Sequence, residues 1–61
     1  MFVRDYPFTT HTVTICEAHH LYTVYDGSVS DIPECLLSYT IVKATVNDSI
    51  HNTYMEVYKL C

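Results

Sequence analysis

Alternating apolar and polar positions predict three β-strands in this chain. In residues 11–18, Val13 and Ile15 fall on one face and polar or small residues on the other. Residues 21–26 and 53–60 show the same two-residue period and are rich in tyrosine and β-branched side chains. The link between the first two strands is short, which favours an antiparallel hairpin. The last strand carries apolar groups on both faces, so we expect both faces to be covered.

The segment Ser28–Ser38 carries the signals of a helix start. Ser30 or Asp31 can cap the free backbone amides, and with Asp31 at the cap Glu34 lies at the third helical position, as in a capping box. Pro33 is tolerated in a first helical turn, where its missing N–H is no loss. We expect the buried side of this helix to consist of the apolar residues at helical spacing, which are Ile32, Cys35, Leu36 and Tyr39.

Residues 39–46 fit two different elements. Tyr39 and Val42 continue the helical spacing, whereas the high content of β-branched residues favours a strand. Residues 47–49, Asn-Asp-Ser, predict a turn before the last strand. The sequence therefore predicts an α+β fold, a small antiparallel sheet with one helix in the order β-β-α-β. An extra strand at 39–46 stays open as an alternative.

Length and apolar content predict one small domain that associates with itself. The 61 residues form a single domain, 1–61, in which residues 1–10 read as an apolar N-terminal arm that packs on the rest. Apolar residues make up 49% of the chain and six residues are tyrosine. This is more apolar surface than the interior of so small a domain is expected to bury. Tyrosine suits interfaces because its ring packs while its hydroxyl stays paired or hydrated. We therefore expect a homodimer.

The residue types and their spacing argue against most kinds of catalytic, metal-binding and phosphate-binding site. The three cysteines are odd in number, and the N-terminus lacks the features of a secretory signal, so we expect reduced thiols and a cytoplasmic location. Histidines and cysteines do not show the paired spacing of structural zinc sites. A metal-binding module is therefore the third and weakest functional hypothesis. The single glycine cannot build a phosphate loop, and no nucleophile turn is present. We expect no enzyme, no cofactor and no metal.

The acidic charge narrows the class of partner. Seven acidic residues against three basic ones give a formal net charge of −4, so a groove that tracks nucleic-acid phosphates is disfavoured. No apolar stretch approaches the ~20 residues needed to span a membrane. The remaining partner is another protein with a basic surface. The competing interpretation is that the carboxylates only cap a helix and keep the protein in solution.

One part of the sequence resembles a known family. The strand Leu21–Gly27 is rich in tyrosine and ends in glycine, and the segment Ser-Val-Ser-Asp-Ile at 28–32 follows it. This pattern is similar to the small dimeric uracil-DNA glycosylase inhibitors of podovirus-type Bacillus phages. Their turn and helix read Ser-Leu-Ser-Asp-Phe-Glu-Val-Leu-Tyr-Gly, and Pro33 would be a one-residue insertion. The match covers roughly residues 10–38.

The resemblance implies a viral DNA mimic that acts in the host cytoplasm. The target enzyme inserts an apolar side chain into DNA as it flips the base, and a dimeric inhibitor would cage that side chain while its carboxylates replace phosphates. Ile32 takes the place of the family's phenylalanine, Glu34 that of its glutamate and Leu37 that of its tyrosine. Residues 39–46 would then extend the helix. The partner-binding residues that we expect are Tyr22, Tyr25, Asp26, Asp31, Ile32, Glu34 and Leu37.

A second function remains open beside the first. The chain could be a small host-takeover or adaptor protein that binds a polymerase, nuclease or regulator without imitating DNA. Salt and competing DNA distinguish the two, because only contacts to a DNA-binding groove depend strongly on both.

Overall fold

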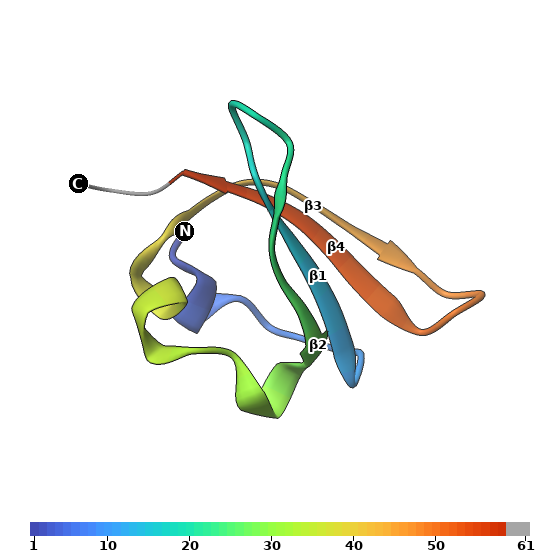
Figure 1. Cartoon of the computed structure of the whole chain (residues 1–61). Coiled ribbons are helices and arrows are strands. Elements are labelled where there is room, and N and C mark those ends of the chain that lie inside the picture. Colours follow the sequence, from blue (N-terminus) through green and yellow to red (C-terminus); the bar gives the residue numbers. More distant parts are fainter. Residues whose placement is uncertain (59–61) are drawn as a thin grey trace.

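The computed structural model describes residues 1–58, in which four strands form one mixed sheet (Figure 1). The strands are β1 (Thr12–Glu17), β2 (Thr23–Ser28), β3 (Thr40–Asn47) and β4 (Asn52–Tyr58). Their order across the sheet is β2-β1-β4-β3. The three strands predicted from alternation are confirmed within one or two residues at most of their ends. Residues 59 and 60 of the predicted last strand lie outside the described residues.

Three short 3₁₀ turns complete the fold, and one face of the sheet packs against them. The turns are η1 (Val3–Asp5), η2 (Val29–Asp31) and η3 (Glu34–Ser38). They lie together in the lower left of Figure 1, away from the β3–β4 hairpin tip. Side chains from η1 and η3 join alternate residues of the two central strands in one buried core. The core residues are Val3, Val13, Ile15, Leu36, Met55 and Val57.

The predicted helix after Ser28 does not form in the described residues. Ile32 is extended, with ψ 125°, because the ring of Pro33 disfavours the α region for the preceding residue. Only six residues, 34–39, then remain before β3, which is too few for a stable α-helix, and Glu34–Ser38 form a 3₁₀ turn instead. The predicted capping box is also wrong, because η3 has no side-chain cap, and Cys35 is exposed rather than buried in the core.

Residues 39–46 are mostly strand, so their predicted extension of the helix is wrong. Eight residues from Thr40 pair antiparallel with β4. The outer side of this strand is also paired at its start, since Phe2 forms a bridge with Thr40 and the Ile41 amide donates to the Met1 carbonyl at 2.8 Å. Backbone pairing on both sides and the β-branched side chains together select the strand.

The sheet is mixed rather than antiparallel throughout, which corrects the predicted fold class. β1 and β4 lie side by side in parallel, whereas β1–β2 and β3–β4 are antiparallel hairpins. A parallel pair requires a long connection, and the 3₁₀ turns supply it by crossing the apolar face. Gly27 lies inside β2 instead of ending it.

The other face of the sheet is polar and not covered by any described element. Hydrogen bonds link its side chains across three strands: Thr12 Oγ1 donates to Asn52 Oδ1 at 2.8 Å, and Asn52 Nδ2 donates to Thr14 Oγ1 at 3.2 Å. Thr14 Oγ1 in turn donates to Asp26 Oδ1 at 3.3 Å. These partners let the face remain in contact with water. The described core lies on one face of the sheet only. No described element covers the second face of β4, as we had expected, and the homodimer stays a prediction.

Among residues 1–58, no helix has the length and apolar character needed to cross a membrane.

Candidate functional site

Three exposed carboxylates follow one another along β2 and the turns after it. Asp26 lies in β2, Asp31 in η2 and Glu34 at the first residue of η3, and all three are exposed. We call these three residues the acidic edge. Side chains alternate between the two faces of a strand, and Asp26 lies on the polar face, opposite Thr14. In residues 1–58, β2 is an edge strand with no neighbouring strand on its outer side.

Tyr25 is fixed next to two of these carboxylates. Its hydroxyl donates to the Ser28 carbonyl at 2.6 Å. Partial burial, and then the negative charges of Asp31 and Asp26, raise the pKa of Tyr25, so its hydroxyl stays protonated and keeps this bond. A Cβ at Gly27 would lie 3.2 Å from the Tyr25 Oη, so glycine leaves the space that the ring occupies. Tyr25 is therefore held in a defined position, near enough to Asp31 and Asp26 for their charges to affect its hydroxyl.

The start of η2 is held by local hydrogen bonds. Ser28 Oγ accepts from the Ser30 amide at 3.3 Å, and the two hydroxyls are 2.8 Å apart. The Val29 amide donates to the His11 carbonyl at 2.8 Å, which ties this turn to the beginning of β1. The position of Asp31 is thus set by the sheet as well as by its own turn.

The seven predicted partner-binding residues do not lie on one continuous surface. Tyr25, Asp26 and Asp31 are brought together. Tyr22 is exposed but lies at the opposite end of β2, before its first residue.

The apolar members of the predicted set face the core. Ile32 and Leu37 are half-buried and pack against the core cluster. No pocket is present in residues 1–58, so these two side chains do not form an apolar cage within one copy.

The charges around the acidic edge are almost all negative. The stretch 5–42 contains five acidic residues and neither lysine nor arginine. One basic side chain reaches this region from outside the stretch, since Arg4 Nε donates to the Leu37 carbonyl in η3 at 3.4 Å. Lys43 lies in β3, opposite Glu56. The acidic edge therefore suits a cationic partner.

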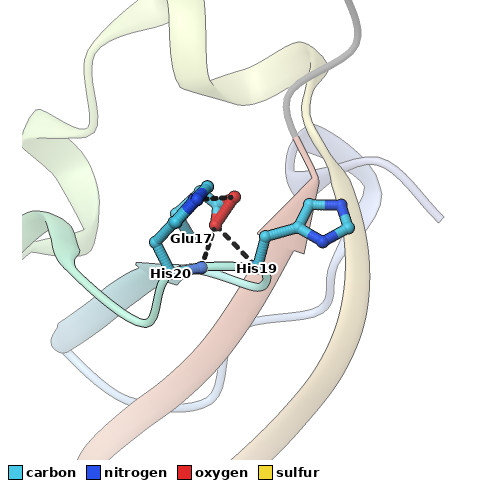
Figure 2. Close-up of polar contacts among 3 residues, drawn as sticks. All are labelled: Glu17, His19 and His20. Atoms are coloured by element: carbon cyan, nitrogen blue, oxygen red, sulfur yellow. Dashed lines mark hydrogen bonds and ion pairs between the residues drawn. The ribbon is translucent and has the colours of Figure 1, made fainter.

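Another carboxylate, Glu17, holds the loop between β1 and β2. Its Oε2 accepts hydrogen bonds from the backbone amides of His19 and His20, the latter at 2.8 Å. Its Oε1 lies 3.5 Å from His20 Nδ1, whereas the His19 ring points away (Figure 2). Sequence reasoning did not find this role, because neither the alternation nor a known turn motif marks it.

These contacts make the loop sensitive to acid. Partial burial would raise the pKa of Glu17, but the hydrogen bonds from the His20 and His19 amides and the nearby His20 ring outweigh it. The pKa of Glu17 therefore lies below its ordinary value of 4.5. A lowered folded-state pKa stabilises the protein above the unfolded-state pKa, and this contribution is lost as the pH falls through the folded-state value.

We expect Glu17→Gln to flatten the acid side of the stability curve. Glutamine keeps an oxygen acceptor but cannot titrate, so between pH 6 and pH 3 the variant should lose less Tm than the wild-type chain. Thermal unfolding followed by circular dichroism measures this. Asp48→Asn, which removes an exposed carboxylate in the β3–β4 turn, is the matched control. Parallel curves for wild type and Glu17→Gln would contradict the role of Glu17.

Residues 1–58 contain no group of three or more histidine, cysteine or acidic side chains placed to hold a metal ion. Cys16 is buried, with its Sγ 3.9 Å from Thr23 Oγ1, and Cys35 is exposed; both are free thiols. Tyr54 lies beside Cys16, and a hydrogen bond with Cys16, partial burial and the charge of Glu56 raise the pKa of Tyr54 to about 12.

Comparison with known proteins finds no matching family model, no matching curated protein and no matching solved structure.

Proposed function

We propose that this chain is a non-catalytic viral inhibitor that places its acidic edge in the DNA-binding groove of a host uracil-DNA glycosylase. The observation that carries the proposal is the row of exposed carboxylates at Asp26, Asp31 and Glu34, within a stretch that lacks lysine and arginine. A protein groove that binds DNA is lined by cationic side chains that neutralise phosphates, and carboxylates on a rigid scaffold can take the place of those phosphates. The resemblance of residues 21–32 to the phage inhibitors selects this enzyme among DNA-binding proteins.

Electrostatics determines how such an inhibitor would act. Charged groups at the edge of an interface increase the association rate and fix the orientation more than they increase affinity. Salt screens them, so inhibition by the acidic edge should weaken as the salt concentration rises.

The intercalating side chain of the enzyme needs an apolar site. In this proposal Ile32 and Leu37 provide it, and burying one aliphatic side chain contributes about 1.5–3 kcal/mol. Both residues are half-buried on the connection between η2 and β3. One copy has no pocket in its described residues, so the apolar site would form where two copies join along this connection. The homodimer is therefore part of the proposal.

An excision assay tests the function directly. The purified chain is titrated into uracil-DNA glycosylase acting on a uracil-containing oligonucleotide, and release of uracil is measured. We expect excision to stop near one dimer per enzyme and inhibition to weaken with added salt. Unimpaired excision at a large excess of the chain would reject this function. Light scattering of the mixture gives the mass of the complex and hence the number of copies.

A second function is favoured by a different feature, the outer edge of β3. The Met1–Val3 arm covers only its start, and Val42 and Val46 farther along are 49% and 37% exposed. An open edge strand can pair with an extended segment of another protein, as an adaptor would. Binding that is insensitive to salt and to competing DNA would favour the adaptor over the inhibitor.

A further inference from the structure

A chain of side-chain hydrogen bonds crosses the polar face of the sheet and ends at Asp26 of the acidic edge. Thr12 Oγ1 donates to Asn52 Oδ1 at 2.8 Å, and Asn52 Nδ2 donates to Thr14 Oγ1 at 3.2 Å. Thr14 Oγ1 then donates to Asp26 Oδ1 at 3.3 Å. Strand register brings these side chains together, because Thr14 lies directly opposite Asp26 and Thr12 directly opposite Asn52.

Each hydrogen bond in this chain has only one possible direction. An ionised carboxylate only accepts hydrogen bonds, so the Thr14 hydroxyl is the donor to Asp26. That hydroxyl has only lone pairs left for its other neighbour, so the amide nitrogen of Asn52 faces Thr14. The amide oxygen of Asn52 then faces the Thr12 hydroxyl. Asn52 thus keeps the Thr14 hydroxyl directed at the carboxylate.

The last bond of the chain holds a carboxylate that is open to a partner. Thr14 and Asn52 are half-buried in the sheet, whereas Asp26 is exposed. The bond engages Oδ1 only, and Lys43 on the same face lies in the far edge strand β3, opposite Glu56. A side chain that is already held in one orientation loses little freedom when a cation binds its other oxygen.

We propose that Thr14 is a positioning residue, which holds Asp26 as the anchor for a cationic side chain of the partner that approaches over the polar face. The identity of the partner rests on the proposed function. Ile32 and Leu37 pack against the core on the other face of the sheet. The enzyme therefore straddles the β2 edge, with a basic group beside Thr14 and its intercalating side chain at the connection behind it.

Three variants of equal net charge test this role. Thr14→Val removes the hydroxyl but keeps the size and β-branching of the side chain, whereas Thr14→Ser keeps the hydroxyl. Thr45→Val is the matched control, because Thr45 lies on the same face, opposite Tyr54, but in β3 at the far edge of the sheet.

The orientation of Asp26 is measured first, in the free protein. Side-chain NMR couplings should show one χ1 rotamer of Asp26 in the wild-type chain, Thr14→Ser and Thr45→Val, and several rotamers in Thr14→Val. Averaged couplings in the wild-type chain, or couplings that do not change in Thr14→Val, would overturn the proposal.

Binding kinetics with uracil-DNA glycosylase separates positioning from a purely structural role. Charge is unchanged, so the association rate of Thr14→Val should stay within about twofold of wild type, while its dissociation rate rises about fivefold. Thr14→Ser should restore the wild-type rate. In an Asp26→Ala background, Thr14→Val should have no further effect. An equally large effect in that background would mean that Thr14 acts on the fold and not through Asp26.

A hexa-arginine peptide at low salt distinguishes this inference from the proposed function, because it supplies cations without the enzyme. Titration should move the carboxyl ¹³C signal of Asp26, and Thr14→Val should weaken peptide binding while Thr45→Val does not. If the peptide responds in this way and the enzyme does not bind, the proposed function fails and the anchor stands. An unmoved Asp26 signal, or equal peptide binding by Thr14→Val and wild type, would overturn the anchor whatever the excision assay shows.

Discussion

Ile15→Ala is expected to unfold most of the protein at room temperature. Ile15 has no exposed surface and lies in β1, between the paired strands β2 and β4. Truncating a buried isoleucine to alanine costs about 2–5 kcal/mol, because apolar burial is lost and a cavity remains. A single core in a chain of this size rarely supplies more than about 3–5 kcal/mol of stability. Far-UV circular dichroism and urea denaturation of the variant measure the loss.

The chain offers a control with the same change of side chain. Ile50 lies in the β3–β4 turn and is 65% exposed, so Ile50→Ala should change the free energy of unfolding by no more than about 0.5 kcal/mol. If Ile15→Ala and Ile50→Ala unfold at the same urea concentration, the core described above is wrong.

Under the proposed function, reversing the charges of the acidic edge should abolish steered association with uracil-DNA glycosylase. In Asp26→Lys/Asp31→Lys/Glu34→Lys, three carboxylates that would face a cationic groove become repulsive. Electrostatic steering accelerates association by about 10–1,000-fold, so we expect the association rate at low salt to fall by at least about 100-fold. Stopped-flow kinetics or surface plasmon resonance at several salt concentrations measures the rate. All three side chains are exposed, so the fold should be retained, and circular dichroism checks this.

Reversing one charge at a time distinguishes the effect of the acidic edge from the effect of the net charge of the chain. Glu34→Lys and Asp48→Lys change the net charge by the same amount, but Asp48 lies in the β3–β4 turn, away from the edge. We expect Glu34→Lys to slow association more. Equal rates for the two variants would show that net charge, and not this edge, governs binding.

The candidate site was only partly visible in the sequence. The three carboxylates are close together along the chain, and all three are exposed in the structure. Ile32 and Leu37 were assigned to the partner surface through the resemblance, and in the structure both are half-buried and pack against the core. Leu21, in the β1–β2 loop, has a positive φ of 57°. The sequence could not reveal this conformation, because it depends on backbone hydrogen bonds between Glu17 and residues 21 and 22 across the loop.

The sequence by itself determined three of the four strands, because a two-residue period and β-branched side chains are local properties that favour an extended backbone. It also determined the acidic character of residues 5–42 and the turns at both hairpins. Only the tertiary structure decided whether 39–46 is helix or strand and how the strands are ordered. The choice at 39–46 depended on backbone partners far away in the chain, β4 on one side and the N-terminal arm on the other. The parallel pairing of β1 with β4 is likewise a long-range contact, and local propensity carries no information about which distant strand will become a neighbour.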